Sequence, residues 1–192
     1  MPATPQHALA AEAEAIRHAP RWQRIIWALR HHDTPLAFVA GRLLMATGLS
    51  RLLTVPHRGF ALRFYDSSIS LQLWLHPPRV PGALEQLFRR YLREGDTVVD
   101  VGANIGLYTM IASVAVGAGG HVHAIEPDPR IAGYLRGNLG LNRTANVTTH
   151  NVALGAQAGS LRFSDQGQDD RNCVVEHGPG RDVPVVRLDA LP

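Results

Sequence analysis

The N-terminal part of the chain has a helical spacing of apolar residues. Four of them fall at positions i, i+3, i+4 and i+7 among arginines, namely Trp22, Ile25, Ile26 and Leu29. This spacing predicts a short basic amphipathic helix. The Ala- and Glu-rich stretch 8–19 before it and the stretch 36–53 after it also favour helices, although glycines such as Gly48 weaken the second.

Between residues 60 and 75 the spacing of apolar residues changes to two. Alternating runs at 60–64 and 69–75 flank the polar segment 66–68, which predicts a β-hairpin. Apolar residues between 84 and 92 then predict a helix that stops at Gly95, a residue suited to a left-handed cap.

From residue 96 onwards, strand and helix patterns alternate. A continuous apolar run predicts a strand at 97–101, as expected of a strand that is covered on both faces. Further strands are predicted at 121–125 and 147–152. Helical patterns lie between them, at 107–116 and from Asp128 to about residue 142. This order with short connections predicts an α/β fold with a parallel, doubly wound sheet.

Composition narrows the class of protein. The 192 residues are 45% hydrophobic and 18% charged, which is typical of a globular domain and excludes a disordered or fibrous chain. The single cysteine, Cys173, excludes an internal disulfide framework and a cysteine metal cluster, and we expect no bound metal. No secretory signal or membrane-spanning segment is predicted, so we expect a cytoplasmic protein.

The charge is unevenly distributed. All 19 basic residues are arginine; residues 1–94 hold twelve of them against six acidic residues, and residues 95–192 hold seven against ten. A basic N-terminal part is compatible with an anionic partner or with peripheral contact to a membrane, but arginine-rich solvated helix faces are the favoured interpretation. We expect no nucleic-acid partner.

Candidate chemistry lies between the first parallel strand and its helix, in the segment from Asp100 to Gly106. Gly102 and Gly106 allow a tight turn that a ligand approaches closely, and Glu126 ends the next strand, placed to bind two ribose hydroxyls. A dinucleotide fingerprint that starts at Gly102 needs glycines where Asn104 and Leu107 stand. The acidic Asp100 also repels phosphates and favours a cationic sulfonium. The residues therefore favour S-adenosylmethionine over NAD.

Five segments together resemble the FkbM-type methyltransferases. They are residues 95–109, 126–129, 135–142, 151–155 and 183–189, and the preceding hairpin and helix at 57–95 also match. The resemblance implies a Rossmann-like class I methyltransferase fold and S-adenosylmethionine-dependent methylation of a small-molecule hydroxyl group on a sugar or a secondary metabolite.

The resemblance also implies the roles of residues at the cofactor site. Glu126 would bind the ribose, with Pro127 beside it, and Asn151 and Val152 would lie at the edge of the adenine. The residues expected to hold the methionine moiety are Asp100, Gly102, Ala103, Asn104 and Gly106. No catalytic base is identified: Asp189 is a weak candidate, and His121 and His123 share a strand face that is expected to be packed surface rather than a ligand pair.

This chain departs from the family pattern at its C-terminal side. The family has a fourth strand with a Lys-Ile-Asp-x-Glu-Gly-like motif, and this sequence contains no lysine. We therefore expect a fold that lacks its C-terminal strands and leaves one edge of strand 97–101 open to an oligomer or a partner chain. The expected organisation is a helical extension at 1–56, a hairpin and helix at 57–95, and a partial S-adenosylmethionine-binding domain at 96–192.

Three functions fit these observations. The first is a methyltransferase whose acceptor half comes from a partner or from missing sequence. The second is a non-catalytic or decayed cofactor-binding fragment. The third, an NAD-dependent oxidoreductase, is disfavoured by Asn104 and Leu107.

Overall fold

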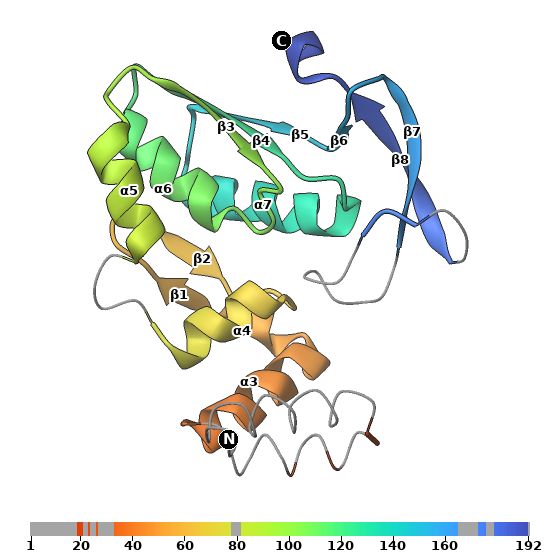
Figure 1. Cartoon of the computed structure of the whole chain (residues 1–192). Helices are drawn as coiled ribbons and strands as arrows, with labels where there is room; N and C mark the ends of the chain where they lie inside the picture. Colours follow the sequence, from red (N-terminus) through yellow and green to blue (C-terminus); the bar gives the residue numbers. More distant parts are fainter. Residues whose placement is uncertain are drawn as a thin grey trace, which may run out of the picture.

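A computed structural model describes residues 19, 20, 23, 26, 33–77, 82–164, 173–175 and 179–191. The predicted helices at 8–19 and 22–29 lie almost entirely outside the described residues, as does the polar stretch 166–170. Figure 1 shows three groups of elements along the chain.

The first group is N-terminal. It consists of helix α3 (Pro35–Thr47), a 3-10 turn η1 (Leu49–Leu52), strands β1 (Thr54–Pro56) and β2 (Ala61–Arg63), and helices α4 (Ser68–Leu75) and α5 (Ala83–Tyr91). The second group is the alternating core: β3 (Thr97–Val101), α6 (Leu107–Val116), β4 (His121–Ile125), α7 (Pro129–Leu141) and β5 (Val147–His150). The third is C-terminal: β6 (Ala153–Leu154), β7 (Gly159–Ser164), β8 (Gly180–Val186) and the 3-10 turn η2 (Leu188–Ala190).

The predicted hairpin of 60–64 with 69–75 is wrong. β2 pairs antiparallel with β1 on its N-terminal side, and the second apolar run forms helix α4. The hydroxyl of Ser67 caps this helix by accepting a hydrogen bond from the backbone N–H of Ser70 at 3.0 Å. An alternating apolar run also contains residues four positions apart, which lie on one face of a helix. Ile69 and Leu73 are such a pair, and both pack against the core.

Two predicted helix boundaries shift at glycines. The helix expected over 36–53 ends at Thr47, because Gly48 adopts a left-handed conformation with φ 74° and the 3-10 turn η1 follows it. Helix α5 ends at Tyr91, before the expected stop at Gly95. Gly95 instead forms the turn into β3, with φ 90° and a backbone hydrogen bond to the carbonyl of Val116.

The predicted parallel sheet is confirmed. β3, β4 and β5 are hydrogen-bonded in that order and all run parallel, with Thr97 opposite His121 and Val122 opposite Val147. Helices α6 and α7 lie on one face of the sheet (Figure 1). The side chains fully buried in and around this layer include Ile105, Val116, Val122, Ile125, Ile131 and Leu135. The α/β class expected from the sequence is therefore present.

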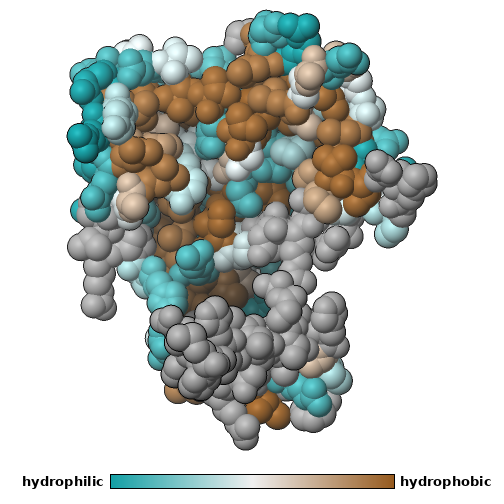
Figure 2. Space-filling model, viewed as in Figure 1, coloured by the Kyte–Doolittle hydropathy of each residue, from teal (hydrophilic) through white to brown (hydrophobic). Residues whose placement is uncertain are grey.

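The opposite face of this sheet is open within the described part of the chain. Along β3 the side chains alternate between half-buried and exposed, and the exposed set includes Val99 at 40% and Val101 at 62%. Figure 2 shows hydrophobic residues along the upper part of the molecule, where β3 lies. Among the described strands β3 also has a neighbour on one side only. The open edge expected from the sequence is thus observed.

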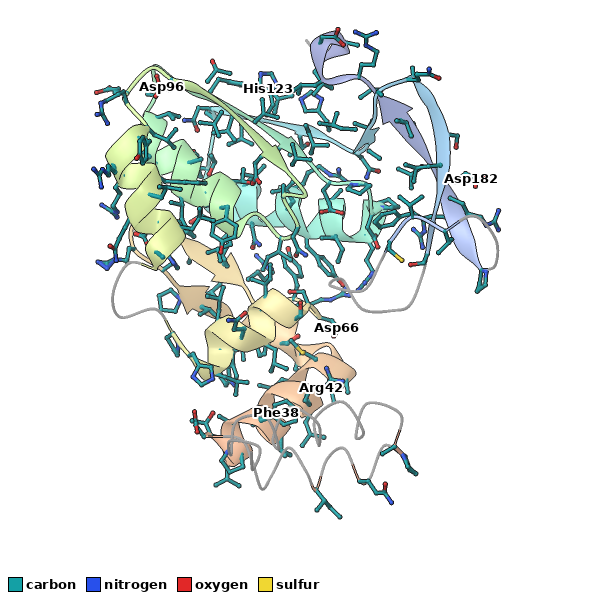
Figure 3. The ribbon with its side chains drawn as sticks, in the orientation of Figure 1. Phe38, Arg42, Asp66, Asp96, His123 and Asp182 are labelled. Carbon is teal, nitrogen blue, oxygen red and sulfur yellow. The ribbon has the colours of Figure 1, made fainter. Side chains whose placement is uncertain are left out.

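Three histidines occupy the same open face. His123 Nδ1 lies 3.1 Å from His150 Nε2, and the His121 ring meets the His123 ring edge-on at 4.9 Å between centroids. Figure 3 labels His123 on the side of the sheet away from α6 and α7. No group of three potential ligands suited to a metal ion is found among the residues that the structure describes.

Two asparagines of α7 join the N-terminal elements to the core. Asn138 is fully buried; its side-chain oxygen accepts from Arg63 N at 2.8 Å, and its amide donates to the carbonyl of Ile105, also at 2.8 Å. One turn later, Asn142 makes both bonds to the backbone of Ala61. Strand β2 is therefore held to α7 by side chains that replace a neighbouring strand.

The C-terminal strands form a separate sheet in the order β6-β8-β7, with β7 and β8 antiparallel. No helix among the described residues is long and apolar enough to cross a membrane.

Replacing Asn138 with Ala should lower the free energy of unfolding by roughly 2–4 kcal/mol. The substitution removes two hydrogen bonds and leaves a buried N–H and a buried carbonyl without partners. Urea denaturation followed by circular dichroism measures the loss. Asn142→Ala, at a half-buried position, is the comparison and should cost less; an equal loss in both variants would contradict the special role of Asn138.

The histidine cluster predicts a pH dependence of stability. Burial, together with the neighbouring His123 and His121, lowers the pKa of His150 in the folded protein below its ordinary value of 6.5. The unfolded chain therefore takes up a proton more readily, and this contribution to stability is lost as pH falls through about 6.5. Between pH 7.5 and 5.5, His150→Gln should lose less stability than the wild type in urea titrations. Parallel pH profiles for the two proteins would refute this.

Candidate cofactor site

A turn between β3 and α6 forms the centre of the candidate site. Three of its residues have positive φ angles: Gly102 at 80°, Asn104 at 50° and Gly106 at 92°. At Gly106 an added Cβ would lie 2.6 Å from Leu135 Cδ1, so the helix start is packed directly on α7. At Gly102 an added Cβ would meet nothing within 4 Å. The turn therefore has one glycine packed against the core and one that faces open space.

The backbone N–H groups of this turn are all used inside the protein. Those of Gly102 and Ala103 both donate to the carbonyl of Ile125 at 2.9 Å. That of Asn104 donates to Glu126 Oε2 at 2.9 Å. The N–H of Ile105 donates to the Asn104 side-chain oxygen at 2.7 Å, and the N–H of Gly106 donates to the Ala103 carbonyl at 2.9 Å. This turn is thus fixed to the end of β4, with no N–H at 102–106 directed at a ligand.

Asp100 lies at the end of β3, on the face covered by α6. Its Oδ2 accepts a hydrogen bond of 2.6 Å from the Thr109 hydroxyl, and Thr109 is fully buried. Burial raises the pKa of the Asp100 carboxyl, and the hydrogen bonds from Thr109 oppose this shift. A half-buried carboxylate held in one orientation is suited to a cationic ligand group, which would offset the cost of its burial.

Glu126 ends β4 beside the turn and is buried, with 7% of its surface exposed. Its two carboxylate oxygens accept backbone hydrogen bonds of 2.9 Å from Asn104 and Asp128. A carboxylate oxygen can accept more than one hydrogen bond, so these two bonds are compatible with the contact to ribose hydroxyls expected from the sequence. In this structure Glu126 first organises the two loops that follow β3 and β4.

Asn151 fixes the end of the third strand. Its amide donates to the carbonyls of Glu126 at 2.7 Å and Pro127 at 3.0 Å, and the backbone N–H of Glu126 bonds to the carbonyl of His150. The turn, Glu126 and Asn151 are therefore brought together at the carboxyl ends of three adjacent parallel strands, which is where ligands bind in open α/β sheets.

The other predicted site residues take different places. The Ala103 side chain is buried in the hydrophobic core, so only its backbone belongs to the turn. Pro127 and Val152 are half-buried, on the loops that follow β4 and β5. Thr109 was not among the site residues expected from the sequence, but its hydroxyl orients Asp100. The only sequence signal for this contact is that Thr109 follows Asp100 by nine residues and lies in the first turn of the predicted helix.

Together these residues fit S-adenosylmethionine. Open space in front of Gly102 allows a ligand to approach the turn, and the Asp100 carboxylate matches a positively charged group. Glu126 adds acceptor oxygens at the end of the next strand.

Comparison with known proteins identifies the same class. Residues 100–191 match the family model of the methyltransferase FkbM domain, which confirms over this segment the resemblance seen in the sequence. This segment is therefore similar to methyltransferases of the FkbM type.

This chain spans less than half of the length of each of the following relatives. The chain is 36% identical over 93 residues to a protein-L-isoaspartate O-methyltransferase from Methanothrix thermoacetophila, which is 48% of this chain and 41% of that protein. A methyltransferase structure from Aquifex aeolicus is 31% identical, with a TM-score of 0.33 and coverage of 34% of this chain and 36% of that one. An Aeropyrum pernix fibrillarin with bound S-adenosyl-L-methionine is 23% identical, with a TM-score of 0.29 and coverage of 32% and 26%.

Replacing each glycine of the turn with alanine should lower the free energy of unfolding by a different amount. Gly106→Ala should lower the free energy of unfolding by roughly 2–4 kcal/mol, because it adds a clash with Leu135 to the cost of a positive φ angle. Gly102→Ala meets no neighbour and should cost about 1–2 kcal/mol from the φ angle alone. Urea denaturation measures both values, and equal losses would show that the Leu135 contact relaxes freely.

Proposed function

We propose that this protein binds S-adenosylmethionine at the turn after β3 and serves in methyl transfer to a hydroxyl group of a small molecule such as a sugar or a secondary metabolite. The observation that carries this proposal is the commitment of every N–H at 102–106 to protein acceptors. A dinucleotide needs such N–H groups for its pyrophosphate, whereas a sulfonium cofactor has no phosphate to bind. The nearby carboxylates also favour a cation.

The bound cofactor would supply an activated methyl group on a sulfonium, so the protein has mainly to bind and position the reactants. Asp100, oriented by Thr109, would hold the positively charged methionine end. Glu126 would bind the ribose hydroxyls while keeping the turn in place. Asn151 would fix the loop that borders the adenine.

The acceptor side of the site has no assigned general base. Asp189 was the weak candidate, but it forms a two-pronged ion pair with Arg187 on the surface. The hydrogen bonds from Arg187 lower the pKa of Asp189, so its carboxylate is a poorer proton acceptor than an ordinary aspartate. The structure therefore gives no support to Asp189 as a base.

We place the acceptor half on a further polypeptide segment that pairs with β3. Support comes from the exposed Val99 and Val101 on this strand and from its single neighbour among the described strands. The segment belongs to a partner chain, to a second copy of the protein, or to sequence outside these 192 residues. We also propose that the protein is cytoplasmic and that its ligand is not a nucleic acid.

Titrating the full chain with S-adenosylmethionine and, separately, with NAD tests the proposed cofactor. Calorimetry should show saturable binding of S-adenosylmethionine and none of NAD. Asp100→Asn and Glu126→Ala should each weaken binding by about tenfold or more, because each loses interactions with charged or hydroxyl groups. Binding of NAD alone would overturn the proposal.

The controls separate loss of the site from loss of the fold. Asp182→Asn removes an exposed carboxylate from the C-terminal sheet, and Figure 3 shows it well away from the turn after β3. This variant should bind S-adenosylmethionine as the wild type does. Glu126→Ala also removes two loop hydrogen bonds, so its circular dichroism spectrum must be checked. Unchanged affinity in a folded Asp100→Asn protein would count against the assigned site.

A further inference from the structure

Arginines gather where the N-terminal elements meet helix α7. Arg51 comes from η1, Arg63 ends β2, and Arg130 lies in the first turn of α7. Tyr134 lies one turn further along α7 and is largely buried. Arg51 and Arg130 both contact its ring. In Figure 3 the label of Asp66 marks this junction between α4 and α7.

Two guanidinium groups approach the same aromatic ring. The Cζ atoms of Arg51 and Arg130 each lie 5.8 Å from the centroid of the Tyr134 ring, within the range of a cation–π interaction. Arg51 Nη2 also donates to the Tyr134 hydroxyl at 3.4 Å. The Tyr65 ring stacks on Tyr134 at 4.2 Å between centroids and holds it in place.

These arginines have no carboxylate partner within 4 Å among the described residues. Arg130 Nη1 donates to the backbone carbonyl of Asp66 at 3.4 Å, and Arg63 Nη1 donates to that of Arg51 at 3.3 Å. Arg130 Nη2 and Arg63 Nε are both shielded from solvent and have no hydrogen-bond partner. Shielded donors on charged groups without an acceptor cost free energy, and an anion placed there would remove that cost.

We propose that Arg51 and Arg130 form a binding site for a phosphate or carboxylate group of a small organic molecule. The planar guanidinium group donates in a fork that matches both kinds of anion, and two such groups neutralise the charge of either. Arg63 positions Arg51 through its bond to the Arg51 carbonyl. The excess of arginine over acidic residues in the first 94 residues agrees with an anionic ligand on this side.

This site is separate from the cofactor site but close to it along the chain. Arg130 follows Glu126 by four residues, across the loop that Asp128 closes by capping α7. The proposal does not depend on the identity of the cofactor. Arg51 and Arg130 make their hydrogen bonds to Tyr134 and Asp66, not to the turn after β3 or to the Glu126 carboxylate.

Titrations of the full chain with inorganic phosphate and with acetate, at constant ionic strength, test this site. We expect saturable binding of at least one anion, and a loss of affinity of about tenfold or more in Arg51→Gln and Arg130→Gln. Arg136→Gln, an exposed position on the same helix, is the matched control and should bind as the wild type does. The anion that saturates distinguishes a phosphate site from a carboxylate site.

The outcomes decide between a site and a purely structural cluster. No saturable binding of either anion, or equal binding in the wild type and Arg51→Gln, overturns the proposal. Arg51 is exposed, so its variant keeps the test valid if Arg130→Gln does not fold. S-adenosylmethionine is titrated into the same preparations. Absence of anion binding by the wild type, with normal cofactor binding, would refute only this site, and anion binding by the wild type without cofactor binding would refute only the proposed cofactor.

Discussion

The end of strand β4 is the point on which the site depends. The carbonyl of Ile125 and the carboxylate of Glu126 accept three consecutive backbone N–H groups from the turn after β3. The second oxygen of Glu126 accepts from Asp128, the residue that caps α7. One buried carboxylate therefore sets the positions of two loops, and its burial is tolerated because both oxygens are hydrogen-bonded. A ligand at this edge meets a surface that is already organised.

A buried polar side chain also fixes the position of the N-terminal elements. Asn138 joins the carbonyl of Ile105, in the turn, to the backbone of Arg63 at the end of β2. The short β1-β2 hairpin has too little core of its own to be stable. It is held on α7 by this residue and by Asn142. A fully buried amide thus connects the candidate site with the junction at which the arginines gather.

Much of the core was predictable from local pattern. Apolar strand runs, the glycines of the turn and the Asp128 cap act over a few residues, so the parallel sheet and its site edge follow from the sequence. The hairpin at 60–75 failed because a short run of alternating apolar residues fits both a strand and a helix, and only the Ser67 cap and packing decide between them. The roles of Thr109 and Asn138 depend on contacts with distant residues, which spacing alone does not reveal.

Charge divides the molecule into two chemically different sides. At the carboxyl ends of the parallel strands the site carries the carboxylates of Asp100 and Glu126, which suit a cation and hydroxyl groups. At the junction with the N-terminal elements the donors without acceptors lie on Arg63 and Arg130, which suits an anion. Helix α7 separates the two, and its first turn contributes to both through the Asp128 cap and Arg130. The two sides therefore suit ligand groups of opposite charge, because carboxylates predominate at one and guanidinium groups at the other.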